Sequence, residues 1–220
     1  MGLTMASLTE RLAALDTCVL SDALDALGLV GVAEGLNRLA TSRKVAGRVM
    51  TVKLEEAKGR TAPRHLCTAA VDAAEPGDVI VVEHHSRADC AGWGGILSKA
   101  AALKGLSGTI VDGMARDIDE AELFGYPVFA KGGIPRTARG RIIETEYATP
   151  ITVDGITVTP GDFVLADGTG VVFVPAARAG EVIAKAESLQ SREAAMIAAL
   201  ERGLKVSDVM AGTYERMLES

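Results

Sequence analysis

The segment Gly92–Glu120, GWGGILSKAAALKGLSGTIVDGMARDIDE, decides how the chain is classified. Its first half predicts a helix from Gly95 to Lys104, which Gly105 ends, and GTIVD at 108–112 then predicts a buried strand. A second helix is expected from Asp117, with acidic residues in its first turn, where the helix dipole favours them. A glycine turn, a helix, a buried strand and another helix in succession indicate an α/β fold.

Weaker patterns on both sides extend this prediction. Ser7 and Glu10 form a capping box that should open the first helix, and Ser21 or Asp22 should lie near the start of the second, which Gly28 ends. The pattern predicts helices over 7–15, 21–27, 61–74 (with Pro63 in its first turn) and 178–202, and strands over 45–53, 79–83, 128–130 and at several places between 139 and 175. We therefore expect one mixed α/β unit with two β layers and helices outside.

Length and composition are those of one ordinary domain. The chain has 220 residues, of which 48% are hydrophobic and only 4% aromatic, so its core should be built from alanine, valine, leucine and isoleucine. We expect a single domain over residues 1–220, with a core over about 15–200.

Charge and cysteine content exclude several classes of protein. The net charge is −6 and no run of lysine and arginine suggests a nucleic-acid surface. No apolar run approaches the roughly 20 residues that cross a bilayer, and the N-terminus has no apolar signal core. The three cysteines lack metal or redox spacing and are expected to be reduced thiols. We expect a cytoplasmic protein that binds neither nucleic acid nor membrane.

The glycines before the first predicted helix of this segment suggest an anion site. Gly92, Gly94 and Gly95 allow a ligand to approach the main chain, and the amides at a helix N-terminus attract carboxylate or phosphate. The loop lacks the Lys-Ser/Thr of a phosphate-binding loop and the spacing of a dinucleotide site. Tight-turn packing remains the alternative explanation.

The next strand-to-helix junction strengthens the first interpretation. Arg116 and Asp117 follow a buried strand, at the end where α/β folds commonly place functional groups. The guanidinium suits an anionic oxygen, and the carboxylate suits a hard cation. The alternative is a helix-start aspartate beside a surface arginine.

With these residues in view, the chain resembles the RraA-like family. The motif is Gly95, twenty residues, Arg116-Asp117, two residues and Glu120, supported by GYPVFAKG at 125–132 and PGDFVLADGTGVVFVP at 160–175. The family includes the 4-hydroxy-4-methyl-2-oxoglutarate/4-carboxy-4-hydroxy-2-oxoadipate aldolases, which are class II pyruvate aldolases. The resemblance covers roughly residues 15 to 200.

The resemblance implies a swivelling β/β/α fold, a trimer or a dimer of trimers, and an active site at the subunit interface. It implies that the amides of Gly94, Gly95, Ile96 and Leu97 hold the pyruvyl carboxylate. Arg116 would hold the substrate, and Asp117 would be the direct ligand of Mg²⁺ or Mn²⁺. The implied activity is cleavage of 4-hydroxy-2-oxo acids to pyruvate, with oxaloacetate decarboxylation beside it. Two alternatives stay open: a non-catalytic regulator of a ribonuclease, and a lyase for a sugar acid.

The residues are consistent with that chemistry. A divalent cation chelated by the keto and carboxylate oxygens stabilises a pyruvate enolate as its charge develops. One aspartate with several waters suits Mg²⁺, and no paired-histidine motif suggests zinc. Lys99 lies among polar helix positions, which argues against a Schiff-base route.

Further candidates carry open alternatives. Glu120 shares a helix face with Asp117 and is a candidate for receiving metal-bound water, against the alternative of an exposed helix acid. In the resembling family, an acid at this position accompanies aldolase activity. Asp112 is a candidate for lining the metal site through water or for stabilising a turn. For Asp167 we favour a structural role.

Three aromatic positions and one glutamate complete the candidate set. His84 and His85 end the strand before the glycine loop and are candidates for substrate contacts, with polar edge residues as the alternative. Trp93 would either line the pocket or, as we favour, pack in the core. Glu193 falls on the apolar stripe of the long C-terminal helix. A charge there needs a partner or a wet cavity, so we expect either a salt bridge at an interface or a catalytic acid or base facing the neighbouring subunit's Asp117.

Overall fold

The computed structural model describes residues 5–62 and 64–210, with side chains from residue 8 onward. Helices are α1 (Met5–Ala13), α2 (Thr17–Ala26), α3 (Thr68–Ala73), α4 (Gly95–Lys104), α5 (Ile118–Leu123), α6 (Ala179–Glu201) and α7 (Val206–Met210), with a 3₁₀ turn at Ala176–Arg178. Strands are β1 (Val32–Ala33), β2 (Asn37–Ala40), β3 (Val45–Glu56), β4 (Val79–Ala91), β5 (Gly108–Ala115), β6 (Val128–Gly133), β7 (Ile142–Tyr147), β8 (Ile151–Val153), β9 (Ile156–Val158), β10 (Phe163–Ala166) and β11 (Val171–Val174).

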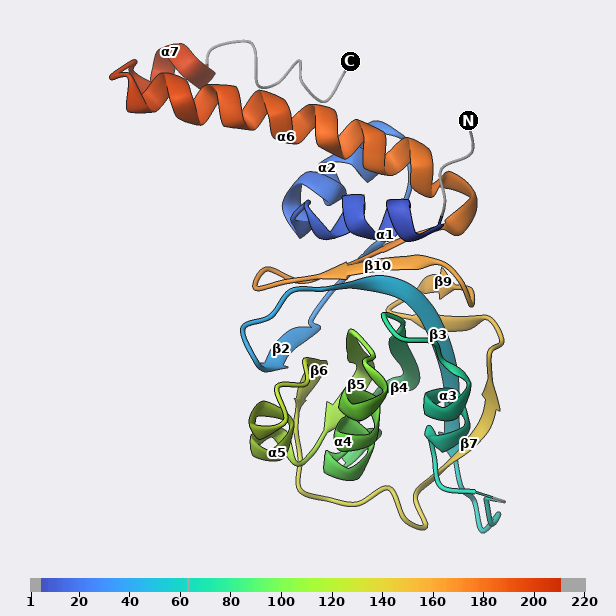
Figure 1. The fold of residues 1–220 in the computed structure, drawn as a ribbon. Coiled ribbons are helices and arrows are strands. Elements are labelled where there is room, and N and C mark those ends of the chain that lie inside the picture. Colours follow the sequence, from blue (N-terminus) through green and yellow to red (C-terminus); the bar gives the residue numbers. More distant parts are fainter. Residues whose placement is uncertain (1–4, 63, 211–220) are drawn as a thin grey trace.

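A curled sheet forms the centre of the molecule (Figure 1). Its strands run in the order β1-β11-β10-β3-β4-β5-β6-β2, with β7 paired to β3 and β8–β9 as a separate hairpin. The strands from β3 to β6 are parallel neighbours, whereas β10 and β11 join antiparallel. Because β4 and β5 are parallel, the loops that follow them emerge at the same edge.

Alternating side chains divide the core into three apolar layers. One face of β3–β6 packs under α3, α4 and α5, and the other packs against β8–β9 and one face of β10–β11. The remaining face of β10–β11 is covered by α1, α2 and α6. This confirms the predicted α/β class, with two β layers and helices outside (Figure 1).

Three predicted helix starts are wrong. The helix expected over 61–74 spans only Thr68–Ala73, because Cys67 is left-handed (φ 65°) and donates its amide to the buried Glu144 carboxylate at 2.6 Å. α2 begins four residues before Ser21, since the side chain of Asp16 caps it by accepting from the Val19 amide at 2.9 Å.

The third wrong start is that of α1. It begins at Met5, so Ser7 lies within the helix and not at the position before its first residue. Pro63 lies outside the described residues. By contrast, the C-terminal helix, expected over 178–202, is confirmed as α6. No helix in the described ranges 5–62 and 64–210 is both long and apolar enough to span a membrane.

Candidate functional site

Two neighbouring strand-to-helix junctions build the site. Where β4 leads into α4 and β5 leads into α5, the chains are tied together by backbone hydrogen bonds. The amide of Gly92 donates to the Met114 carbonyl at 2.8 Å, and the amide of Arg116 donates to the Trp93 carbonyl at 3.0 Å. These bonds place the glycine loop against Arg116 and Asp117, as the sequence predicted.

Gly94 and Gly95 are glycines because Asp117 and its neighbours occupy the space of a side chain. A Cβ at Gly94 would lie 2.9 Å from Asp117 Oδ2 and 3.2 Å from Arg116 Nε. A Cβ at Gly95 would lie 3.1 Å from Asp117 Cβ and 3.3 Å from Glu120 Oε2. The glycine loop therefore serves close approach of functional side chains as well as a tight turn.

The N-terminus of α4 presents backbone amides to the pocket. Its first intrahelical bond runs from the Ser98 amide to the Gly94 carbonyl at 3.0 Å, so the three preceding amides have no carbonyl within the helix. Asp117 Oδ2 accepts from the Gly95 amide at 2.9 Å. The amides of Ile96 and Leu97 remain for an anion, in the field of the helix dipole.

Arg116 and Asp117 carry the opposite charges of the site. Asp117 precedes α5 in a left-handed conformation (φ 57°, ψ 43°), and its side chain makes no capping bond. Arg116 Nε lies 3.2 Å from Asp117 Oδ2, and the two side chains are 39% and 33% exposed. Because its carboxylate is turned to the Gly95 amide and partly open to solvent, Asp117 is accessible to a ligand.

A small open cleft of about 70 Å³ lies over these groups. It is lined by His65, Leu66, Ala91, Trp93, the four residues Gly94–Leu97, Arg116, Asp117, Thr137 and Ala138. A groove between α4 and α5 continues from it past Lys99, Glu120 and Phe124. Glu120 is exposed and adjoins Gly95, so the structure brings it together with Asp117.

The donor set fits a hard divalent cation that keeps most of its waters. Within the described residues, no group of three or more His, Cys, Asp or Glu side chains is arranged to hold a metal ion. Asp117 offers a carboxylate oxygen, and Glu120 stands nearby. Mg²⁺ and Mn²⁺ accept such a site when water or substrate supplies the other oxygens, whereas a structural zinc site needs more protein ligands.

The Asp112 side chain does not lie beside Asp117. Its neighbour Val111 packs under α4 and α5, and Asp112 points to the other face of the sheet. There it accepts from Ser86 Oγ at 3.0 Å and lies 3.3 Å from Lys131 Nζ. This arrangement favours the structural alternative that the sequence left open.

The histidines lie behind or beside the loop. His84 is fully buried, its Nε2 is 2.9 Å from the Cys90 carbonyl, and its ring would meet a Cβ at Gly92 or Gly113. Burial lowers the pKa of His84 below its usual 6.5. His85 is half exposed, 3.7 Å from the Glu83 carboxylate. Neither lines the pocket, so the polar-edge and packing interpretations fit better.

Trp93, Asp167 and Lys99 behave as expected. Trp93 is buried, stacks on Tyr126 and donates from Nε1 to Ser98 Oγ at 2.9 Å. Asp167 accepts from the amide and hydroxyl of Thr17 at 2.9 and 2.7 Å, which is a structural role. Lys99 is exposed, with Nζ 4.9 Å from the centre of the Phe124 ring.

Glu193 lies far from the site of its own chain. It is on α6, which covers the opposite side of the sheets from α4 and α5 (Figure 1). Partial burial, and then the carboxylates of Asp16 and Asp22, raise the pKa of Glu193. Within one subunit the structure therefore does not place Glu193 near Asp117.

Sequence reasoning missed the residues that extend the pocket away from α5. His65 and Thr137 line it, and Arg64 and Arg139 lie farther along. They come from two segments, 57–66 and 137–143, that β3 and β7 bring together. The arginines of 136–141 were a usable signal, but their partner segment was predicted as a helix.

Comparison with known proteins gives the family of the chain. The RraA-like family model, described as Aldolase/RraA, matches residues 17–173. The chain belongs to the RraA-like family. Some relatives in sequence are named as putative 4-hydroxy-4-methyl-2-oxoglutarate aldolases, and one neighbour in structure is described as a member of an RraA protein family.

Among curated relatives, protein DlpA of Legionella pneumophila is 28% identical over 200 residues, which are 91% of this chain but only 32% of that protein. A Halalkalibacterium halodurans protein named "Putative 4-hydroxy-4-methyl-2-oxoglutarate aldolase" is 30% identical and aligned over 81% of each chain.

Among solved structures, an uncharacterized Pseudomonas syringae protein has a TM-score of 0.85 at 32% identity, covering 95% of this chain and 99% of its own. A Streptomyces coelicolor protein, described as an unusual member of the RNase ES inhibitor RraA protein family, has a TM-score of 0.80 at 26% identity, covering 93% and 100%. Family and fold are thus shared with proteins named for two different functions.

Proposed function

We propose that the chain is a divalent-metal-dependent aldolase that cleaves 4-hydroxy-2-oxo acids, of the 4-hydroxy-4-methyl-2-oxoglutarate type, to pyruvate and a second oxo acid. The observation that carries this proposal is the convergence of three groups in one pocket. These are the free amides at the N-terminus of α4, the Arg116 guanidinium, and the Asp117 carboxylate with Glu120 beside it. The aldolase names of the relatives support it.

Each group has a distinct task in this proposal. The amides of Ile96 and Leu97 bind the substrate carboxylate at the positive end of α4. Arg116 donates to the oxygen on which negative charge develops. Asp117, with Glu120 acting through water, would hold Mg²⁺ or Mn²⁺, and a cation bound there would stabilise the pyruvate enolate. Oxaloacetate decarboxylation passes through the same enolate, so we propose it as a side activity.

Cleavage requires a group that accepts the proton of the substrate's C4 hydroxyl. Among the described residues of one subunit, Glu120 is the only evident acceptor. We propose that Glu193 of a neighbouring subunit faces Asp117 and takes this proton, in a trimer or a dimer of trimers. Partial burial, and then the carboxylates of Asp16 and Asp22, raise the pKa of Glu193, which is the direction expected for a carboxylate that accepts a proton.

A pyruvate-release assay tests the activity. The purified protein is given a panel of 4-hydroxy-2-oxo acids and oxaloacetate with Mg²⁺ or Mn²⁺, before and after chelation by EDTA. We expect turnover that EDTA abolishes and either metal restores, and near-complete loss in Asp117→Ala. Turnover that survives thorough chelation, or a near-native Asp117→Ala variant, contradicts the metal assignment.

A regulatory role is the second candidate, because a structural neighbour is described as belonging to an RNase ES inhibitor family. In that case the chain docks on a ribonuclease and has no lyase activity. A pull-down with the ribonuclease beside the pyruvate assay separates the two. Binding without pyruvate release favours the regulator, and Glu120 beside Asp117 argues for the enzyme.

A further inference from the structure

His65 brings an imidazole to the wall of the proposed active site. It lies in the loop after β3 and lines the same cleft as the glycine loop, Arg116 and Asp117. The residue is exposed, whereas His84 is buried beneath the glycine loop. Of the three histidines in the chain, His65 is the only one that lines this cleft.

The proposed cleavage needs a second proton transfer besides the one from the C4 hydroxyl, because C3 of the enolate must gain a proton to become a methyl group. The ionisable side chains that line the cleft in the described part of the chain are His65, Arg116 and Asp117. A guanidinium keeps its protons, and Asp117 is assigned to the cation. An imidazole both gives and takes protons near neutral pH, so His65 is the lining residue suited to this transfer.

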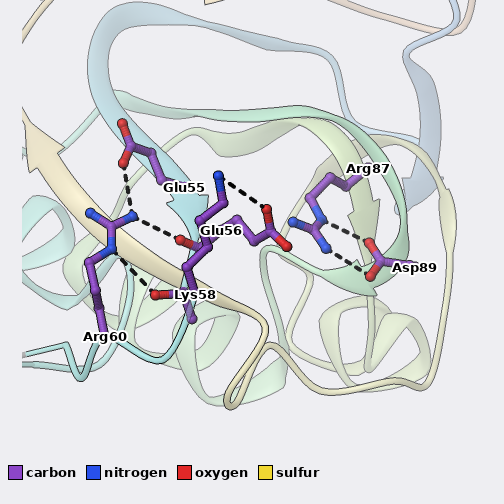
Figure 2. Close-up of polar contacts among 7 residues, drawn as sticks. Glu55, Glu56, Lys58, Arg60, Arg87 and Asp89 are labelled. Atoms are coloured by element: carbon purple, nitrogen blue, oxygen red, sulfur yellow. Dashed lines mark hydrogen bonds and ion pairs between the residues drawn. The ribbon is translucent and has the colours of Figure 1, made fainter.

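The loop that carries His65 is fastened at its start by Arg60. Nη2 of Arg60 lies 3.0 Å from the Glu55 carboxylate and 2.8 Å from the Glu56 carbonyl, at the end of β3 (Figure 2). Its Nε and its backbone amide both donate to the Ala57 carbonyl, at 3.3 and 2.7 Å. These bonds from one residue fix the direction in which the loop leaves the strand.

The buried carboxylate of Glu144, on β7, fastens the other end of the loop. It accepts from Arg64 Nε at 2.8 Å and from the Cys67 amide at 2.6 Å. Its side chain is fully buried, so water does not compete for these bonds. The two donors flank His65 in the sequence, and the Thr68 hydroxyl donates to the His65 carbonyl at 2.8 Å. The backbone of His65 is therefore held in place from both sides.

The contact of the imidazole with the protein determines which nitrogen can exchange a proton. Nδ1 of His65 lies 3.1 Å from the Leu66 carbonyl oxygen. Because a carbonyl oxygen only accepts hydrogen bonds, Nδ1 carries a hydrogen in the neutral ring as well as in the cation. The proton that His65 gains and loses is therefore the one on Nε2.

We propose that His65 is a further catalytic residue, whose Nε2 carries the proton to and from C3 of the pyruvate unit. The inference rests on the proposed function, which supplies the substrate. When the C3–C4 bond breaks, its electron pair stays on C3 as the enolate, C4 becomes a carbonyl, and the hydroxyl proton goes to its carboxylate acceptor. Protonated His65 then gives its Nε2 proton to C3, and the neutral ring regains a proton from water.

Binding of oxalate tests the contact without turnover, because oxalate has the planar shape and the negative charge of the pyruvate enolate. The chain has three histidines, so a spectrum of protein labelled with ¹³C and ¹⁵N at histidine is simple to assign. With Mg²⁺ present, oxalate should shift the imidazole signals of His65 and leave those of His85 in place. Unshifted His65 signals, when calorimetry shows that oxalate is bound, overturn the inference. If oxalate does not bind, the proposed function is contradicted and the inference falls with it.

Exchange of the pyruvate methyl protons in D₂O tests the proton transfer itself. His65→Asn keeps an N–H donor for the Leu66 carbonyl but removes Nε2, and it should slow this exchange on the order of 10²-fold. His85→Asn is the matched control. It removes the same ring from outside the cleft, at a left-handed position (φ 53°) that asparagine accepts, and it should exchange at the wild-type rate.

Oxaloacetate separates proton transfer from a role in shaping the cleft. Loss of CO₂ leaves the same enolate without a proton from His65, and an enolate that leaves the site takes its proton from water. His65→Asn should therefore slow oxaloacetate consumption by less than about 10-fold, a smaller loss than that of exchange. Equal losses in both reactions, or wild-type exchange in His65→Asn, overturn the inference.

The same measurements distinguish this inference from the proposed function. If the wild-type protein neither exchanges pyruvate protons nor consumes oxaloacetate, the proposed function fails and the inference fails with it. If exchange depends on His65 but no 4-hydroxy-2-oxo acid is cleaved, the aldolase proposal fails and the proton transfer by His65 stands. If the acids are cleaved and His65→Asn exchanges like the wild type, the aldolase stands without a catalytic His65.

Discussion

Replacing Gly94 by alanine should cripple the site without unfolding the chain. Gly94 has an extended backbone (φ −161°), which alanine adopts freely, so the added methyl acts only through its contacts. That methyl would start 2.9 Å from Asp117 Oδ2 and 3.2 Å from Arg116 Nε. To reach an ordinary contact distance, the Asp117 carboxylate must retreat by about 0.5 Å, and its 2.9 Å bond to the Gly95 amide must lengthen accordingly.

The cost in stability is small and the cost in function large. Losing one hydrogen bond to a partly exposed carboxylate should lower the free energy of unfolding by about 1 kcal/mol. In the proposed reaction Asp117 holds the metal, so displacing its carboxylate should lower kcat/KM on the order of 10²-fold, because misplacement of this size removes the productive geometry. Pyruvate release and urea unfolding measure the two effects on the same preparation.

Gly180→Ala is the matched control. Gly180 lies in the first turn of α6, and the methyl that alanine adds there would have no neighbouring heavy atom within 4 Å outside its own helix turn. This change should therefore leave activity intact and raise helix stability by up to about 1 kcal/mol. An active Gly94→Ala protein with native metal affinity would refute the placement of Asp117 in the site. A Gly94→Ala variant that fails to fold would show that the carboxylate cannot retreat as described.

The site and its surroundings yield three further predictions. Arg116→Lys should lose kcat/KM by on the order of 10²-fold in the pyruvate assay, since an ammonium cannot reproduce the planar fork; a few-fold loss would place Arg116 outside the site. Glu193→Gln should assemble and bind metal but lose most aldol cleavage while keeping more oxaloacetate decarboxylation. Mixed oligomers with Asp117→Ala should regain activity, and no recovery in verified mixtures counts against a site shared between subunits. Burial lowers the pKa of His84 below its usual 6.5 in the folded protein. As the pH falls below about 6.5, the histidine therefore takes up a proton more readily in the unfolded chain than in the folded one. The free energy of unfolding should decrease over that pH range. His84→Gln should flatten that part of the pH profile of urea unfolding, and an unchanged profile contradicts the assignment.

The part of the site between Gly94 and Asp117 could be predicted because its residues lie close together in the sequence. The helix after Gly94, the buried strand over 108–112 and the junction at Arg116-Asp117 follow from periodicity and from glycine placement, and the structure has all three. Neighbouring parallel strands then bring the two junctions together without further information. The order of residues in the sequence is therefore enough to predict that the helix amides, the Arg116 guanidinium and the Asp117 carboxylate lie together.

The direction in which the Asp112 side chain points could not be predicted from the sequence. Along a strand, alternate side chains face opposite sides, so Asp112 points away from the face that Val111 shares with α4 and α5. Which face carries the site depends on where the helices cross the sheet, and the spacing of residues does not specify this. Lys131 and Ser86, the partners that hold Asp112, come from other strands.

The extension of the pocket past Arg64 and Arg139 was missed because its two walls are distant in sequence. The loop after β3 and the segment before β7 become neighbours only when Leu54 pairs with Glu144 and Glu55 with Ile143. The helical periodicity of 61–74 also concealed the left-handed residue Cys67, whose conformation depends on the Glu144 carboxylate. A tertiary hydrogen bond thus outweighed local propensity at this point.

One strand, β3, belongs to both β layers. Residues Val45–Arg48 pair with β10, and Val49–Lys53 pair with β4 without interruption. Separating the layers would therefore require β3 to bend near Arg48 and Val49, where its pairing passes from β10 to β4. Amide protons on either side should then exchange through one shared opening event, and the layer under α6 should lose protection together with the layer that carries the glycine loop.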